Sequence, residues 1–187
     1  RGLGDVYKRQ KYCHVDKRLR DAIYQLVDCY TLFYYQFVKA AHGVDEEYWV
    51  RLMRTPTYNT WCGLSFERVC LLHTRQIKKA LGISGIMANI FSWHIKSNIY
   101  HPGVQIDLLI DRADNVVNIC EMKYAPEGYA MTAASLKSLK TKIGVLRQYI
   151  SPRKYISTVM VTSNGVIRNQ HSSEIPEFVN ADQLFEP

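Results

Sequence analysis

The hydrophobic period of this chain changes from helical to strand-like near Gly82, and this change constrains the fold more than any other feature. Before Gly82, apolar residues recur every three or four positions, which is the spacing of amphipathic helices. After Gly82 the period approaches two, which predicts strands, before one further helical stripe. The predicted helices cover residues 15–41, a short piece around Trp49, 59–81 and 136–150, and the predicted strands cover 86–93, 104–111, 116–123 and 154–162.

These elements predict an α/β fold with an α-β-β-β-α-β core and a mixed central sheet, preceded by a helical lobe. Residues 1–10 (RGLGDVYKRQ) have no apolar period, and we expect them to be a non-native segment left by sequence assembly. Residues 11–56 are the predicted lobe, and residues 57–187 the predicted α/β domain. Half of the aromatic residues fall in 11–61, and their helical spacing favours a packing surface over a platform for base stacking.

Composition excludes several classes of protein. With 47% hydrophobic and 22% charged residues the chain is not a disordered one, and no run approaches the roughly 18 apolar residues of a membrane span. The five cysteines form no CxxC pair and the six histidines no HxxxH or HExxH pattern, so neither a disulfide framework nor a zinc site is expected. The chain therefore reads as a cytoplasmic protein with reduced thiols and no membrane partner.

Three of the charged residues in two of the predicted strands can come together. Asp107 lies within 104–111, and Glu121 and Lys123 lie two apart, on one face, within 116–123. If the two strands form a hairpin with a connection at 113–115, the register places Asp107 opposite Glu121. Charges inside apolar strands are costly unless they are paired or bind a metal, so these residues are the candidate site.

Two facing carboxylates repel each other unless a cation lies between them. Mg²⁺ or Mn²⁺ suits such a pair, because carboxylates are its ligands and it keeps water positions open for a phosphate. A neighbouring lysine can orient the attacking water and stabilise charge in the transition state. These residues predict hydrolysis of phosphodiester bonds, with Asp107, Glu121 and Lys123 as catalytic residues. The alternative is a salt bridge of Lys123 with one of the acids on a solvated face.

The Asp107…Glu121-Met122-Lys123 pattern, set in these strands, resembles the PD-(D/E)xK restriction-endonuclease-like superfamily. Gln105-Ile106 stands where that pattern has Pro. A wider run is similar to the C-terminal part of prokaryotic AAA-type ATPases of the archaeal-ATPase-like, DUF234-type group. The residues that carry this wider resemblance are 28–38 (DCYTLFYYQFV), 63–67 (GLSFE), 103–107 (GVQID) and 120–123 (CEMK).

The resemblance implies a nuclease-like domain in which Glu67 joins Asp107 and Glu121 as a metal ligand. It also implies that this chain is a piece of a longer polypeptide, in which ATP binds only to an upstream module. No GxxxxGK[ST] phosphate loop occurs in the sequence. The alternative within the same family is a catalytically idle domain that binds nucleic acid or a partner for the ATPase.

Positive charge is concentrated near the predicted helix 136–150. Residues 123–154 contain seven Lys or Arg and one acid, Glu127, in a chain whose formal net charge is +7. This distribution predicts contact with the phosphate backbone of DNA. The predicted nucleic-acid-binding residues are Lys137, Lys140, Lys142 and Arg147. Lys140 is expected to lie closest to the acidic site, with the others on a solvated face.

Overall fold

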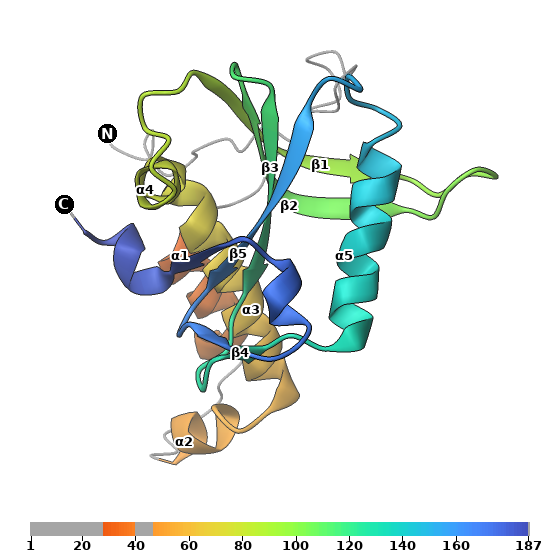
Figure 1. Ribbon diagram of the computed structural model, residues 1–187. Helices are drawn as coiled ribbons and strands as arrows, with labels where there is room; N and C mark the ends of the chain where they lie inside the picture. Colours follow the sequence, from red (N-terminus) through yellow and green to blue (C-terminus); the bar gives the residue numbers. More distant parts are fainter. Residues whose placement is uncertain (1–27, 40–46, 187) are drawn as a thin grey trace, which may run out of the picture.

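The computed structural model describes residues 28–39 and 47–186, which form an α/β fold around a five-stranded mixed sheet (Figure 1). The strand order is β1-β2-β3-β5-β7, with the first two pairs antiparallel and the last two parallel. The strands are β1 (Ala88–Ile95), β2 (Val104–Arg112), β3 (Val116–Lys123), β5 (Tyr155–Thr162) and β7 (Glu177–Asn180). A separate parallel ladder joins β4 (Tyr129–Ala130) to β6 (Val166–Ile167).

Helices cover both faces of the sheet. α5 (Ala133–Leu146) lies on one face, and α3 (Pro56–Leu72) and α4 (Thr74–Ala80) lie on the other (Figure 1). Strand β3 alternates between the two cores, with Ile119 packed on the α5 side and Cys120 on the α3 side. A strand buried on both faces needs apolar residues at nearly every position, so the charge of Glu121 is exceptional in β3.

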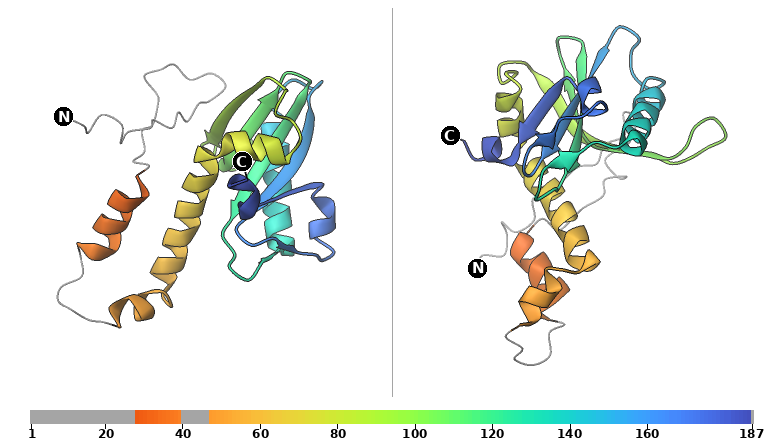
Figure 2. Two further views of the ribbon diagram at one scale, coloured as in Figure 1. Left: turned by 90° about the vertical axis from the view of Figure 1, so that its left-hand side faces the viewer. Right: turned by 60° about the horizontal axis from the view of Figure 1, so that its bottom comes forward.

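The helical lobe packs on the N-terminal half of α3. It contains α1 (Cys29–Phe33), a π-helical turn (Tyr34–Val38) and α2 (Tyr48–Leu52) (Figure 2). Its aromatic rings meet those of α3 at centroid distances of 5.4–6.4 Å, which confirms a packing surface. The rings are Phe33, Phe37, Trp49, Tyr58 and Trp61. The remainder of the helix predicted over 15–41, and residues 1–10, lie outside the described residues.

The helix predicted over 59–81 is two helices with an earlier start. Thr55 caps α3 by accepting a hydrogen bond from the Tyr58 N–H at 3.2 Å, and Pro56 occupies the first helical position. Proline is favoured there because its missing N–H would have no helical partner. His73, at φ −107° and ψ 29°, separates α3 from α4. Gly82 ends α4 with a φ of 68°, as predicted.

The segment 174–186, for which the sequence predicts no strand or helix, contributes to the sheet and the core. It contains β7 and the 3₁₀ turn Ala181–Leu184, in which Val179 and Leu184 are buried against the α3 side. A strand of four residues is too short to show a clear period of two, so the sequence pattern does not predict β7. A further 3₁₀ turn covers Ser172–Glu174.

None of the helices in the described ranges combines the length and the apolar composition needed to cross a bilayer. Among the cysteines of the same ranges, Cys62, Cys70 and Cys120 are buried free thiols and Cys29 is exposed.

Candidate active site

Strands β2 and β3 form a hairpin in the predicted register. The pairs run from Asp111 opposite Val117 to Leu108 opposite Cys120, so the numbers of each pair sum to 228. Asn115 closes the connection in the left-handed conformation, with φ 65°. Such a residue is typical of three-residue hairpin loops. The hairpin prediction is confirmed over these four pairs.

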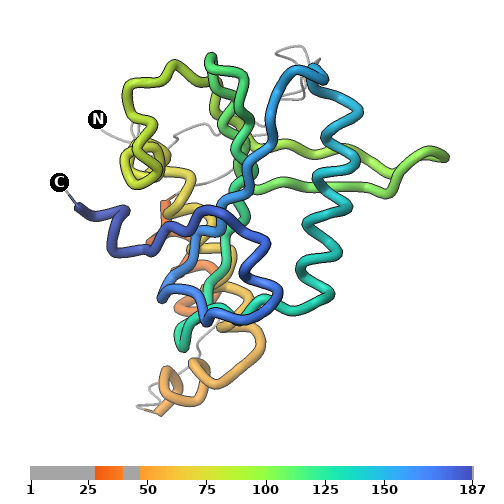
Figure 3. The backbone as a smooth tube through the Cα atoms, in the orientation of Figure 1, coloured from red at the N-terminus to blue at the C-terminus, as the bar shows by residue number. Residues whose placement is uncertain are grey.

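Beyond this ladder the two strands part, and Asp107 lies where they separate. β2 continues beside β1 behind α5, whereas β3 continues beside β5 (Figure 3). Oδ2 of Asp107 accepts a hydrogen bond from the backbone N–H of Met122 at 3.1 Å. The carbonyl oxygen of Asp107 accepts one from the Ser92 hydroxyl at 2.6 Å. The carboxylate therefore lies between the strands, where it satisfies an N–H that the ladder no longer pairs.

Glu121 is a buried acid, with only 5% of its surface exposed. Its carboxylate accepts two hydrogen bonds from Nζ of Lys142, at 2.6 Å to Oε1 and 2.7 Å to Oε2. Nζ of Lys123 lies 3.8 Å from Oε2. Burial raises the pKa of Glu121, the charge of Asp107 raises it further, and the two lysines oppose both effects.

Glu67 lies on α3, within electrostatic range of both other acids. Burial and the charge of Asp107 raise the pKa of Glu67 to about 7, with a smaller contribution from Glu121. The positive charges of Lys123 and Arg68 act in the opposite direction. The three acids that the resemblance groups together therefore share one region, reached from β2, β3 and α3. The metal-binding role of Glu67 stays a prediction.

A cavity of about 300 Å³ opens between β3 and α5 next to this region. Glu121 is its only acidic lining residue, and hydroxyl and ammonium groups supply most of its polar wall. The polar lining residues are Glu121, Lys123, Tyr129, Ser135, Ser138 and Lys142. Tyr129 belongs to β4, whose ladder with β6 fixes the loop after β3 as one wall. A donor-rich cavity of this kind is suited to an anionic group.

The donor chemistry of the acids suits Mg²⁺ or Mn²⁺, which bind oxygen ligands and accept one or two carboxylates with water and phosphate as the rest. Within residues 28–39 and 47–186, no three His, Cys, Asp or Glu side chains are gathered into a ready metal-binding group. Lys142 takes both oxygens of Glu121, and Met122 takes one oxygen of Asp107. The ammonium of Lys142 thus lies beside the oxygens that would bind a cation, and it neutralises the charge of Glu121 as a metal ion would.

The four predicted DNA-binding residues on and after α5 have different surroundings. Lys142, with 19% of its side chain exposed, reaches the acidic site, whereas Lys140 extends outward to Glu174 at 2.5 Å. The expectation that Lys140 lies closest to the site is therefore wrong. Arg147 donates a hydrogen bond to the carbonyl oxygen of Lys154 at 2.6 Å.

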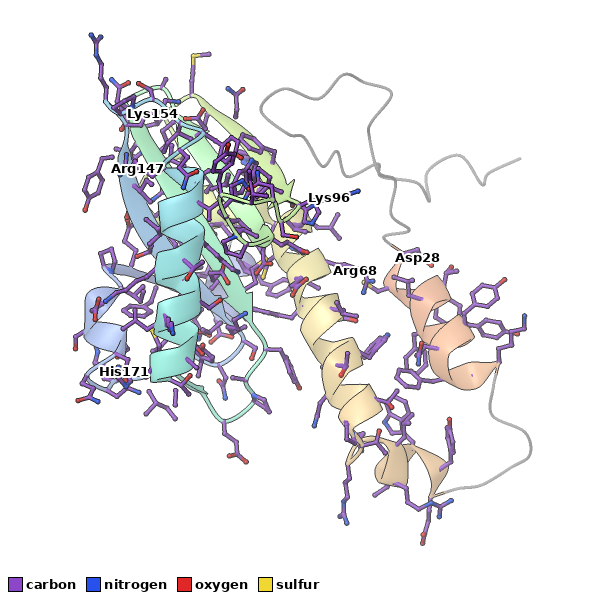
Figure 4. The ribbon with its side chains drawn as sticks, turned by 90° about the vertical axis from the view of Figure 1, so that its right-hand side faces the viewer. Asp28, Arg68, Lys96, Arg147, Lys154 and His171 are labelled. Atoms are coloured by element: carbon purple, nitrogen blue, oxygen red, sulfur yellow. The ribbon has the colours of Figure 1, made fainter. Side chains whose placement is uncertain are left out.

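On the outer side of α5, Lys137 and Lys140 line a groove of about 470 Å³ together with His171. Figure 4 looks onto α5, with Arg147 and Lys154 near its C-terminal end and His171 near its N-terminal end. The groove therefore lies near the N-terminal end of α5, apart from the cavity on its inner side. Lys137 and Lys140 remain candidates for contact with a phosphate backbone.

The place of Lys142 in the site could have been found from sequence. It follows Leu139 by three positions and precedes Leu146 by four, so it lies on the apolar stripe of the helix. A lysine on that stripe must extend along the sheet or find a buried anion. Ser135, Ser138 and Tyr129 gave no comparable signal, because only the packing of α5 and the β4–β6 ladder brings them to the cavity.

Comparisons of this chain with models of known protein families and with curated proteins find no match.

Proposed function

We propose that this chain carries a nuclease-like domain that hydrolyses phosphodiester bonds of DNA with Mg²⁺ or Mn²⁺. The observation that carries the proposal is the meeting of Asp107, Glu121 and Lys123 where β2 and β3 part. Glu121 is a buried acid among the mostly apolar residues of β3, and burial and the charge of Asp107 raise its pKa, which favours a site that binds cations.

In the proposed reaction, Asp107 and Glu121 would hold the divalent ion, with Glu67 of α3 as a third acid. When bound, the ion would stabilise negative charge on the phosphate and acidify a water molecule. Nζ of Lys123, close to Glu121 and lining the cavity, orients that water and stabilises negative charge that develops on the phosphate. The donors of Ser135 and Ser138 face the cavity in which a phosphate oxygen would lie.

We further propose that the domain belongs to a longer prokaryotic AAA-type ATPase of the DUF234-type group, with a PD-(D/E)xK-like core. One support is the order α3-α4-β1-β2-β3-β4-α5-β5, which gives the expected α-β-β-β-α-β sequence when the short β4 of the separate ladder is set aside. The other is the position of the Asp…Glu-x-Lys pattern on β2 and β3. The upstream ATPase module of the same polypeptide would be the principal protein partner, and ATP would bind only there.

Incubation of purified protein with supercoiled plasmid and Mg²⁺ tests the activity. Wild-type protein should nick or linearise the plasmid, and Asp107→Ala and Lys123→Ala should not. Chelation of Mg²⁺ by EDTA should abolish cleavage by the wild type. Equal cleavage by all three proteins would identify a contaminating nuclease and refute the proposal.

A second candidate is the idle domain, which binds nucleic acid without cutting it. The ion pair between Lys142 and Glu121 favours this candidate, because it neutralises the buried acid without a metal. DNA binding that weakens with salt, persists in Asp107→Ala and is never accompanied by cleavage would support the idle domain.

A further inference from the structure

Lys142 holds Glu121 more closely than any other group described at the site. Its ammonium donates to both carboxylate oxygens, at 2.6 and 2.7 Å, and both residues are largely shielded from water. By contrast, Nζ of Lys123 stays 3.8 Å from Glu121 and is more exposed. Hydrogen bonds between charged groups are the strong ones, and a buried carboxylate needs such a partner.

This contact sets up a competition. A cation that binds Glu121 needs the oxygens to which Lys142 donates, and two positive charges beside one carboxylate repel each other. Lys142 must therefore move away for the acid to serve as a metal ligand. Its long side chain allows this movement without a shift of α5, which is fixed by the buried residues Leu139 and Leu146.

Resting on the function proposed above, we infer that Lys142 is an internal counter-ion of Glu121 that a divalent cation displaces. The displaced ammonium of Lys142 then binds the substrate phosphate. Lys142 thereby couples cation binding to substrate binding: neither the cation nor the phosphate binds well until the other is present. By thermodynamic linkage, DNA must strengthen cation binding by the same factor by which the cation strengthens DNA binding.

The lining of the cavity indicates that the group bound by the displaced ammonium of Lys142 is a phosphate. Among the described residues that line the cavity Glu121 is the only acid, so an ammonium that leaves it meets no other carboxylate of these residues. The neighbouring polar groups are the hydroxyls of Ser135 and Ser138 and the ammonium of Lys123. These groups donate hydrogen bonds, and together with Lys142 they match the oxygens of a phosphodiester.

Calorimetric titration with Ca²⁺ or Mn²⁺ in the absence of DNA tests the competition. Lys142→Gln keeps a hydrogen-bond donor for Glu121 but removes the competing charge, so it should bind the cation about tenfold more tightly than the wild type. Lys142→Arg keeps the charge and should bind like the wild type. Lys96→Gln is the control for the loss of one positive charge, because Lys96 is exposed after β1 and belongs neither to the proposed site nor to the predicted DNA-binding residues.

The same titration in the presence of a short DNA duplex tests the coupling. DNA should tighten Ca²⁺ binding by wild type and Lys96→Gln about tenfold, and should leave Ca²⁺ binding by Lys142→Gln nearly unchanged. Circular dichroism melting establishes that each variant is folded. Equal cation affinity of wild type and Lys142→Gln, or no cation binding by either at millimolar concentration, would overturn the inference.

The outcomes separate this inference from the proposed hydrolysis. If the wild type cleaves plasmid but Lys142→Gln binds cations no more tightly, the hydrolysis proposal stands and the inference fails. If Lys142→Gln binds more tightly and DNA coupling depends on Lys142, but no protein cleaves plasmid, the inference stands and hydrolysis fails.

Discussion

The carboxylate of Asp107 accepts a hydrogen bond from the backbone N–H of Met122, at 3.1 Å. The acid proposed to hold the metal is thus also the group that satisfies β3 where it leaves β2. These two roles need different properties, since the metal requires a negative charge and the N–H requires only an acceptor. Substitutions at Asp107 can therefore separate catalysis from folding.

Asp107→Asn should abolish plasmid cleavage and keep the fold, because the amide oxygen can still accept from Met122. Asp107→Ala should also abolish cleavage, but it leaves that N–H unpaired and should lower the free energy of unfolding by about 1–3 kcal/mol. Urea denaturation of both variants measures the difference. Equal destabilisation of both would mean that the hydrogen bond to Met122 contributes nothing to the fold.

Lys123→Ala should reduce cleavage by about 10²- to 10³-fold, the range expected when one group that stabilises charge in the transition state is removed. Because Lys123 is partly exposed and lies 3.8 Å from Glu121, the free energy of unfolding should change by less than about 0.5 kcal/mol. Lys96→Ala, at an exposed position after β1, is the control for the loss of one charge. A similar loss of cleavage in both variants would show that Lys123 acts only through net charge.

Glu67→Gln should make stability less dependent on pH. The pKa of Glu67 is raised to about 7 in the folded chain, so the folded state binds a proton more readily than the unfolded state. Glu67 therefore favours folding most below about pH 4.5, and this contribution is lost as the pH rises through about 7.

Above pH 7.5 the Gln variant should be more stable than the wild type by roughly 1–2 kcal/mol, an amount reduced for partial exposure to solvent. The two should converge near pH 4.5. Thermal melts across this pH range measure the difference, with Glu127→Gln in the exposed loop after β3 as control. A constant difference at every pH would contradict the electrostatic explanation.

Much of the core fold could be predicted from sequence because the pattern there is strong. β3 was predicted with its exact bounds, and the 113–115 connection gave the hairpin register. The break at His73 and the short strand β7 were missed for a shared reason. Neither feature changes the local spacing of apolar residues enough for a sequence pattern to predict it.

Some features of the candidate site could likewise be predicted from sequence, and others could not. Glu121 and Lys123 could be placed on one face because alternation in a strand is a local rule. The apolar stripe places Lys142 on the buried side of its helix, but its partner Glu121 lies 21 positions away on a strand, so no local rule identifies that partner. The tight turn fixed the position of Asp107 along the strand, but the parting of β2 and β3 that places its carboxylate beside Met122 follows from the pairing of β1 and β5.

Tyr149→Phe should destabilise the fold by about 1 kcal/mol. The Tyr149 hydroxyl lies 2.7 Å from Nε2 of His101, which is buried in the loop between β1 and β2. This hydrogen bond ties that loop to the end of α5. Tyr155→Phe, at a tyrosine with 66% of its surface exposed, is the control. Urea denaturation curves with equal midpoints for the two variants would show that the hydrogen bond between Tyr149 and His101 does not stabilise the fold.

Lys137→Gln and Lys140→Gln should affect DNA binding unequally, although both lysines line the outer groove of α5. Lys140 is already paired with Glu174 at 2.5 Å, so its charge is partly neutralised before DNA arrives. Loss of a lysine that contacts a phosphate lowers the slope of log affinity against log salt by about 0.9.

Lys137→Gln should therefore lower that slope by about 0.9 and Lys140→Gln by clearly less, whereas Glu174→Gln, which frees Lys140, should strengthen binding. Fluorescence anisotropy of a labelled duplex at several salt concentrations measures all three. Unchanged slopes in all three variants would remove the outer groove from the DNA-binding surface and leave the cavity between β3 and α5 as the phosphate contact.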